Sequence, residues 1–235
     1  VKFADIVLLE SEAQKDFFAE HYDDSDKFKV LYTGVDESLF YPANNVKKES
    51  GAKIVLFRGR LTPESGIFHI LKSAELLKGR KDIVFRIVGF HYRLGPQVKN
   101  IIQEKKLTNV DLVYDYLSDD ALFEKMKDAS ISLGQFESSP RLDRTIPHKI
   151  FESMVMGFPL ITAYSKAVGE LLKDGESCIF VRRADPAHLA EKICFIADNP
   201  EVANRLADNA RIAYEKKCST EVLMTELFDI IQKQL

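Results

Sequence analysis

The chain has 235 residues, of which 46% are hydrophobic and 29% charged, a balance typical of a globular protein with a substantial core. Its formal net charge of −3 argues against a general nucleic-acid binder, since such proteins carry an excess of Lys and Arg. The three cysteines have no metal-binding spacing and indicate thiols in a reducing compartment, so we expect a cytoplasmic protein. No apolar run reaches the roughly 18 residues of a membrane span. Because the sequence begins at Val1 without a Met, we expect an upstream part to be missing.

The first forty or so residues predict two short strands and one helix. Apolar runs at residues 4–9 and 28–32 predict the strands, and residues 11–21 between them predict the helix. The polar residues 44–52 that follow show no periodicity, which is typical of a linker. We therefore expect a domain boundary there.

Beyond the linker, strands and helices alternate to the end of the chain. The predicted strands are residues 54–57, 83–88, 110–114, 130–133, 160–162 and 178–181. The predicted helices are residues 66–78, 95–105, 119–127, 147–156, 167–173, 186–198, 200–216 and 220–234. This alternation indicates βαβ units, and therefore an α/β fold with a parallel sheet flanked by helices. Ligands bind such sheets at the carboxyl ends of the strands, which selects the loops 58–66, 89–94, 114–118 and 134–148 as candidates.

Residues 145–162 contain the most informative helix. Pro147 suits a helix start, and Lys149 and Glu152 lie three residues apart on one helix face. A helix N-terminus with a lysine attracts an anion, and a carboxylate one turn later can accept hydrogen bonds from sugar hydroxyls. The pattern thus indicates a binding site for a sugar nucleotide. An ordinary capped helix with a solvent-facing ion pair remains the alternative.

The loop after the first strand of this region offers a second candidate. Gly59 allows close approach of the backbone to a ligand, and Arg60 can hold a diphosphate through two parallel N–H bonds. A tight turn with an exposed arginine explains the same residues. Neither a GxGxxG nor a GxxxxGK[ST] motif is present, so neither a dinucleotide oxidoreductase nor a P-loop ATPase is supported.

Three further positions fall at the same expected edge of the sheet. Gly89 ends a strand and permits close approach of a ligand to the backbone, although a strand-end turn explains it equally well. Tyr116 and Leu117 are candidates to border a nucleobase, although core or surface tyrosines are more common. His91 has no visible partner and is expected to be a surface histidine. The long loop 134–148 is charged, and loops of this length are usually functional or mobile. No His, Cys, Asp or Glu cluster has metal spacing, so no metal is expected.

Taken in order, these landmarks resemble the donor-binding half of a GT-B-fold retaining glycosyltransferase (group 1, family 4 type), and the likeness covers nearly the whole chain. The matching pieces are KVLYTGVDESLFYP, IVLFRGRLTPESGIFHILKSAELL, FRIVGF, PHKIFESMVMGFPLIT and ELLKDGESCIFV. The resemblance implies two Rossmann-like domains facing each other across a cleft. It assigns residues 1–43 to the tail of the acceptor domain, 44–52 to a linker and 53–218 to the nucleotide-sugar domain. Residues 219–235 would be a helix that returns to the first domain.

The resemblance also implies roles for particular residues. Arg60 matches the arginine on the donor diphosphate, and Glu152 matches the glutamate that holds the ribose hydroxyls. Further contacts are expected from the donor-site positions Gly59, Gly89, Tyr116, Leu117, Thr145, Ile146, Pro147 and His148.

Two positions depart from the pattern. Ser65 replaces the usual lysine, and Arg144 the usual acid, with Asp143 one place away. We expect Lys149 to supply the missing positive charge, so that Arg60 and Lys149 stabilise the leaving group. The missing acid leaves the sugar and retention of configuration open.

The sequence therefore predicts a glycosyltransferase part that binds a nucleoside-diphosphate sugar and serves polysaccharide or glycoconjugate synthesis. The expected acceptor is a sugar or lipid-linked molecule, with peripheral membrane association through the missing domain. No cofactor is expected, and this part alone should transfer sugar poorly. The alternatives are an incomplete nucleotide-sugar-binding scaffold and a sugar-nucleotide epimerase.

Overall fold

The computed structural model describes residues 3–42, 51–89 and 93–233. The strands are β1 (Val7–Leu9), β2 (Phe28–Val30), β3 (Lys53–Arg58), β4 (Ile83–Val88), β5 (Val110–Val113), β6 (Ile131–Leu133), β7 (Leu160–Ala163) and β8 (Ile179–Val181). The helices are α1 (Glu12–Ala19), α2 (Ile67–Leu76), α3 (Gly95–Glu104), α4 (Asp119–Met126), α5 (His148–Met156), α6 (Lys166–Gly169), α7 (Pro186–Asp198), α8 (Pro200–Lys217) and α9 (Thr220–Gln232). Short 3₁₀ turns span Ser25–Lys27 and Pro63–Ser65.

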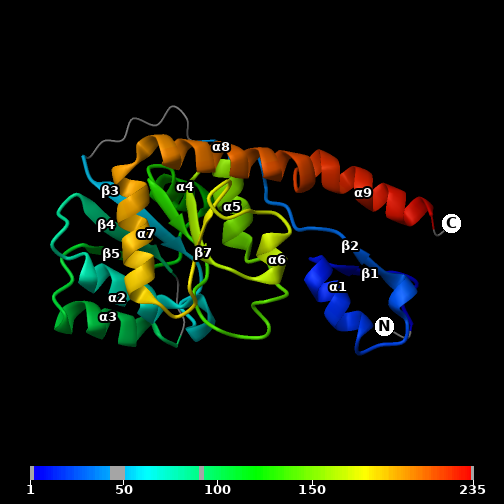
Figure 1. Cartoon of the computed structure of the whole chain (residues 1–235), viewed down its shortest axis with the longest axis horizontal. Helices are drawn as coiled ribbons and strands as arrows, with labels where there is room; N and C mark the ends of the chain where they lie inside the picture. Colours follow the sequence, from blue (N-terminus) through cyan, green and yellow to red (C-terminus); the bar gives the residue numbers. More distant parts are fainter. Residues whose placement is uncertain (1–2, 43–50, 90–92, 234–235) are drawn as a thin grey trace.

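Six of the strands form one parallel sheet in the order β5-β4-β3-β6-β7-β8 (Figure 1). The chain builds outward from β3 through β4 to β5 and then crosses back to β6 on the other side of β3. The strand order therefore reverses between β3 and β6. In open parallel sheets this switch point is where loops diverge and leave a crevice for ligand.

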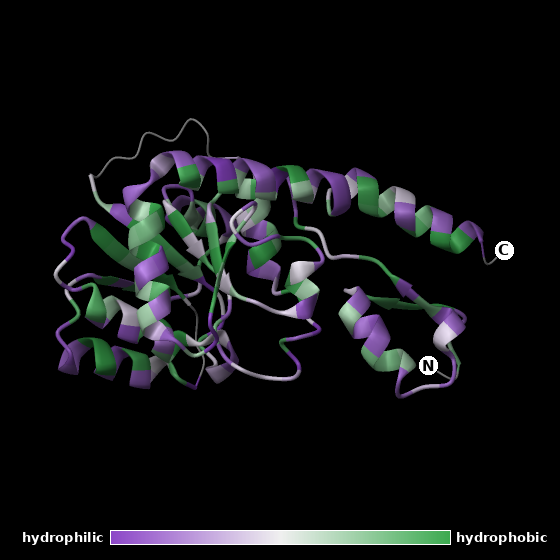
Figure 2. Cartoon of the chain, in the orientation of Figure 1, coloured by the Kyte–Doolittle hydropathy of each residue, from purple (hydrophilic) through white to green (hydrophobic). Residues whose placement is uncertain are grey.

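Helices cover both faces of the sheet, and each face has its own apolar core. One cluster joins Phe57 and Phe85 to residues of α2, α3 and α7. The other joins Leu56 to residues of α4, α5 and α8. Alternate residues of a strand point to opposite faces. Figure 2 accordingly shows the strands as largely hydrophobic and the outer helices as mixed.

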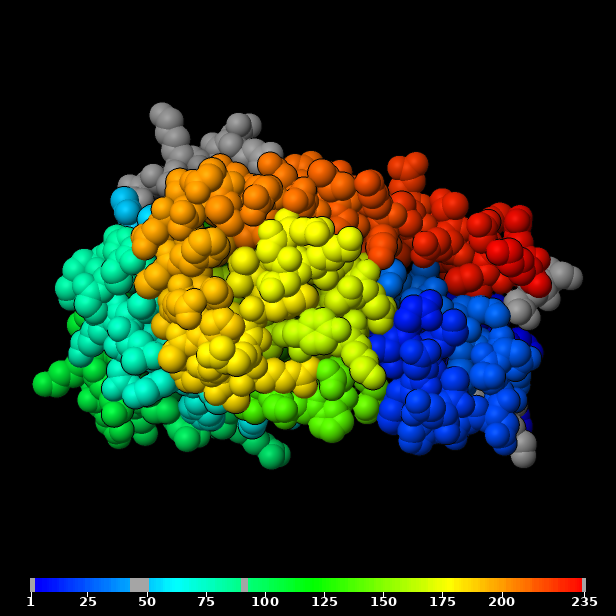
Figure 3. Space-filling model, viewed as in Figure 1, coloured from blue at the N-terminus to red at the C-terminus, as the bar shows by residue number. Residues whose placement is uncertain are grey.

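Residues 3–30 form a small lobe beside the sheet domain, in which β1 and β2 pair in parallel and α1 packs on β2 (Figure 3). Two acceptors of the sheet domain hold α1. The Glu170 carboxylate accepts from the backbone N–H groups of Glu12 at 2.9 Å and Ala13 at 2.8 Å, and the carbonyl of Arg144 accepts from Ser11 Oγ at 2.7 Å. Helix α9 continues beyond α8 along the edge of this lobe, as Figure 1 shows.

The α/β fold predicted from the sequence is confirmed, and most predicted elements lie within a few residues of the observed ones. The bounds of β4 and α7 match the expected residues 83–88 and 186–198. Three differences matter: α6 ends at Gly169 rather than residue 173, β1 begins at Val7 rather than residue 4, and Pro147 caps α5 instead of starting it. Most of the predicted linker, together with His91, lies outside the described residues.

Candidate functional site

The candidate site lies at the switch point, where β3 ends beside the start of α5. Pro147 has extended backbone angles (φ −62°, ψ 137°) and turns the loop into α5, which Gly157 ends in a left-handed conformation (φ 69°). Every residue of the helix from Lys149 to Met156 is buried. Lys149 and Glu152 therefore point into the protein, and the alternative of a solvent-facing ion pair is wrong.

Glu152 is the centre of the site, and its side chain is 1% exposed. Its Oε1 atom receives Nη1 of Arg58 at 2.7 Å and Nδ1 of His148 at 3.0 Å. Its Oε2 atom is buried and has no hydrogen-bond partner among the described residues. A buried carboxylate oxygen without a donor is costly, so Oε2 is a natural acceptor for hydroxyl groups of a ligand.

His148 connects Glu152 to the N-terminal segment. Its Nε2 lies 3.1 Å from the carbonyl oxygen of Gly34, while its Nδ1 faces Glu152. Both neighbours only accept hydrogen bonds, so both ring nitrogens must carry a proton for the two bonds to form. The pKa of His148 is raised, first by its bond to the Glu152 carboxylate, against the opposing effect of burial.

Lys149 shares the helix face of Glu152, and its side chain reaches the loop that follows β3. Its Nζ sits 3.9 Å from the ring centroid of Phe57, a cation–π arrangement. Burial is the main reason that the pKa of Lys149 is lowered to about 7; the Glu152 carboxylate opposes this shift, and the positive charge of Arg58 adds to it. The charge of this lysine therefore changes near neutral pH.

Gly59 makes room for this lysine. A Cβ atom at Gly59 would lie 3.1 Å from Nζ of Lys149, and the backbone φ of +143° is one that other residues rarely adopt. Arg60 follows directly and is exposed on the same loop. Arg58, which the sequence analysis missed, is the arginine that pairs with Glu152.

A pocket of about 120 Å³ opens beside Arg58 between the ends of β3 and β4 and the start of α4. It brings together four of the predicted positions, Gly59, Gly89, Tyr116 and Leu117. Gly89 serves packing there, because an added Cβ would lie 2.8 Å from Cδ2 of Leu61. Tyr116 lies at the rim of the pocket and is 85% exposed.

The remaining predicted positions belong to the loop before α5. Ile146 is buried in the apolar cluster under α5, so its side chain serves the core. Thr145 donates from Oγ1 to the carbonyl of Arg141 at 3.3 Å. Thr145 and Pro147 line a second, smaller cavity together with Tyr164 and Arg183.

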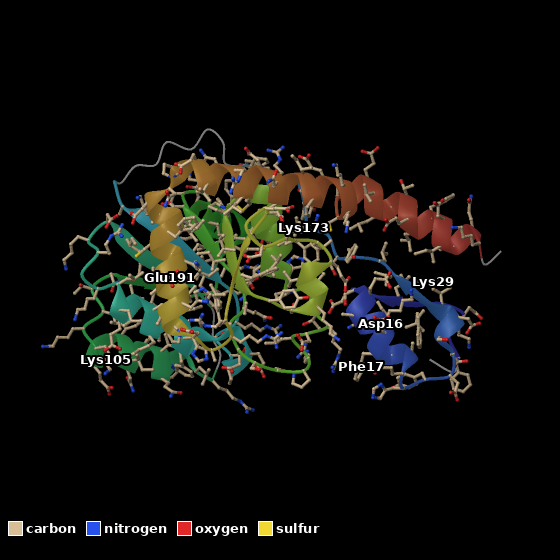
Figure 4. The ribbon with its side chains drawn as sticks, viewed as in Figure 1. Asp16, Phe17, Lys29, Lys105, Lys173 and Glu191 are labelled. Atoms are coloured by element: carbon tan, nitrogen blue, oxygen red, sulfur yellow. The ribbon has the colours of Figure 1, made fainter. Side chains whose placement is uncertain are left out.

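The two departures from the family pattern both have protein partners. Ser65 is buried and donates to the carbonyl of Thr62 at 2.6 Å. The guanidinium of Arg144 lies 3.8 Å from the ring centroid of Phe17, a residue of α1 labelled in Figure 4. Asp143 pairs with Arg183. Within the described ranges, no group of three or more His, Cys, Asp or Glu side chains could hold a metal ion, and no helix is long and apolar enough to cross a membrane.

The sheet, its switch point and the buried Glu152 together define an α/β domain with a candidate ligand site at the carboxyl edge of its sheet. The model of the family described as "Glycosyl transferases group 1" matches residues 43–213. The chain belongs to this family.

Two curated relatives show how much of a whole protein the chain represents. An MMP alpha-(1->4)-mannosyltransferase of Mycolicibacterium hassiacum is 24% identical over 208 residues, which cover 88% of this chain and 48% of the relative. An alpha-D-kanosaminyltransferase of Streptomyces kanamyceticus is 28% identical over 158 residues, which cover 67% of this chain and 39% of the relative. The chain thus spans about half the length of the curated relatives it matches, or less.

Solved structures show the same fold. A glycosyltransferase from Rickettsia africae superposes with a TM-score of 0.83 at 20% identity, covering 97% of this chain and 63% of the other. Anabaena Alr3699/HepE, in complex with UDP and glucose, superposes with a TM-score of 0.82 at 18% identity, covering 98% of this chain and 64% of the other. The sheet domain is therefore the Rossmann-like domain of a GT-B fold, as predicted.

Proposed function

We propose that this chain is the donor-binding part of a glycosyltransferase that moves a sugar from a nucleoside-diphosphate sugar to an acceptor. The observation that carries the proposal is the unpartnered Oε2 atom of the buried Glu152, held beside Arg58 at the switch point of the sheet. Such an atom needs donors that come from a ligand, and the hydroxyls of a ribose supply them. The Anabaena neighbour in complex with UDP has the same fold.

The positions of the side chains support a role for each of them. Glu152 accepts from the ribose hydroxyls, the base enters the pocket of Gly89, Tyr116 and Leu117, and the diphosphate lies over Gly59 near Arg60 and Lys149. Thr145 to His148 offer backbone contacts at the start of α5. Two cationic side chains and a helix N-terminus can offset the charge of the departing diphosphate, so we expect transfer without a metal ion.

The domain assignment is part of the proposal. Helix α9 has no buried residue, and Met224, Phe228 and Ile231 of this helix are 62%, 62% and 45% exposed. Apolar side chains spaced four and three residues apart form one face of a helix. We expect this face to pack on an upstream acceptor domain, which would also hold the sugar or lipid-linked acceptor and provide any peripheral membrane contact.

The test is donor binding by calorimetry. UDP, GDP and their sugars are titrated into the chain and into Glu152→Gln, which keeps the size of the side chain. We expect the variant to bind roughly tenfold or more weakly, equivalent to about 1.4 kcal/mol, with an unchanged circular dichroism spectrum. Equal affinity in both proteins would contradict the role of Glu152.

A nucleotide-sugar-binding scaffold is the second candidate, because Ser65 and Arg144 replace residues of the family pattern and both have partners within the protein. An assay of a longer protein that includes the upstream domain distinguishes the two functions. Transfer or hydrolysis of the donor there supports the enzyme, whereas donor binding without turnover supports the scaffold.

A further inference from the structure

The carboxylate of Glu152 is held by two cationic groups from different parts of the chain. Arg58 is the last residue of β3, and His148 is the first residue of α5. Both contact the same oxygen, Oε1, at 2.7 Å and 3.0 Å, while Oε2 has no partner among the described residues. The two oxygens of one carboxylate therefore have different surroundings.

The two contacts at Oε1 restrict the orientation of the Glu152 carboxylate. A glutamate has three rotatable bonds, and holding a long side chain in one geometry costs conformational entropy when a ligand binds. Two donors that meet at Oε1 from separate elements fix the orientation of the carboxylate before the ligand arrives. Oε2 is then left as the acceptor available to the ribose.

The two donors are themselves fixed. Arg58 extends from a strand with paired neighbours on both sides, β4 and β6. His148 is held at its far side by the carbonyl of Gly34, 3.1 Å from Nε2, and its ring lies 6.5 Å from that of Phe151. The carboxylate is thus braced by the sheet and by the segment that leads from the N-terminal lobe.

We propose that Arg58 and His148 are positioning residues that aim Glu152 at the ribose of the donor. This inference rests on the proposed function, because it assumes that Glu152 binds the ribose. Neither residue needs to touch the donor sugar, and both act through the carboxylate that they hold.

The test compares a ribonucleotide with its counterpart that lacks the hydroxyls. The probes are UDP and 2′,3′-dideoxy-UDP, or the GDP pair if GDP binds better, and the measured quantity is the ratio of their dissociation constants. Hydrogen bonds to a charged group predict a preference for the ribonucleotide of roughly ten- to a hundredfold in the unmodified chain. Changes in charge or stability that weaken both ligands equally cancel in this ratio.

We expect Glu152→Gln to lower the ratio by roughly tenfold, and Arg58→Met and His148→Asn to lower it by several-fold while the dideoxynucleotide keeps its affinity. Arg58→Lys should restore part of the ratio, since a lysine provides one charged donor in place of a planar fork. Arg86→Met is the matched control, because Arg86 lies on the neighbouring strand β4, pairs with Asp111 of β5 and with Asp128 after α4, and has no part in the site. It should lower stability and leave the ratio unchanged.

The outcomes separate the two levels of the proposal. A ratio that Glu152→Gln leaves unchanged removes the ribose contact and with it both proposals. A ratio lowered by Glu152→Gln but unchanged in Arg58→Met and His148→Asn overturns the positioning role alone. If only one of these two variants lowers the ratio, the role belongs to that residue and is overturned for the other.

Discussion

Lys149 allows the proposed diphosphate contact to be tested through pH. In the free protein burial lowers its pKa to about 7, whereas a bound diphosphate favours the ammonium form and raises the pKa again. Binding above neutral pH must therefore take up a proton. The ammonium fraction falls from about nine-tenths at pH 6 to about one-tenth at pH 8, so donor affinity should fall roughly tenfold over that range.

The assay is calorimetry with UDP-glucose or GDP-mannose, whichever binds, since their phosphates do not titrate in this range. Repeating the titration at pH 8 in buffers of different ionisation enthalpy should show uptake of nearly one proton. Lys149→Met should bind weakly and without proton uptake, whereas Lys192→Met, which alters a lysine paired with Glu191 on α7, should behave like the unmodified chain. Proton uptake that persists in Lys149→Met would refute the assignment.

The same pKa shift predicts that the stability of the folded chain rises with pH, whereas donor affinity falls. Folding lowers the pKa of Lys149, so the charged form is disfavoured in the folded state and the lysine costs stability below its ordinary pKa of 10.5. The cost is complete below about pH 7 and disappears as pH rises toward 10.5; a shift of this size corresponds to roughly 5 kcal/mol. Lys149→Met should therefore raise the unfolding free energy, most at pH 6 and least at pH 10. If Lys149 stabilised the fold instead, Lys149→Met would lower the unfolding free energy, and that result would contradict the prediction.

Three further predictions test the surroundings of the site. Gly59→Ala should lower the unfolding free energy by about 1–2 kcal/mol and weaken donor binding, because the backbone φ of +143° is strained for alanine and the added Cβ contacts Lys149. Gly175→Ala is the control: its φ is +69° and no atom lies near the added Cβ, so it should lower stability without changing donor binding. Chemical denaturation measures the stability, and calorimetry measures the binding. Glu170→Gln should weaken the hold on α1 by about 1–2 kcal/mol, visible as faster hydrogen exchange at residues 12–19 with unchanged protection of β3. Phe228→Ser should change the stability of this chain by less than about 0.5 kcal/mol, yet loosen a longer protein that includes the upstream domain; equal thermal shifts in both proteins would contradict a docking role for α9.

The sequence was most informative where local chemistry sets the boundaries. Helix α7 begins after Asp185, whose side chain accepts from the backbone N–H of His188, and Pro186 occupies its first position. Both signals are visible in the sequence, and the predicted bounds are correct. Helix α6 was predicted too long because Leu171 and Leu172 continue its apolar pattern, yet they reach the core beyond a single helical turn that ends at Gly169.

Arg58 shows what the sequence did not reveal. Strand alternation places Arg58 on the same face as Leu56 and opposite Phe57. Leu56 packs in the cluster that contains α5, so the alternation directs Arg58 toward Glu152. Assigning Arg58 as the partner of Glu152 required knowing which face of the sheet α5 covers, and this depends on the crossing from β5 to β6. The carbonyl of Gly34 was missed for a similar reason, because it is 114 residues from His148 in the chain.

The charges around Glu152 explain how this site could work without the family lysine that Ser65 replaces. Arg58 and His148 are cationic in the observed geometry and Glu152 is anionic, so these three groups leave one positive charge. Lys149, with a pKa of about 7, is only partly charged near neutral pH in the empty protein, and a bound anion favours its ammonium form. These four groups would then carry two positive charges, in addition to that of Arg60, against the two negative charges of a nucleoside-diphosphate sugar.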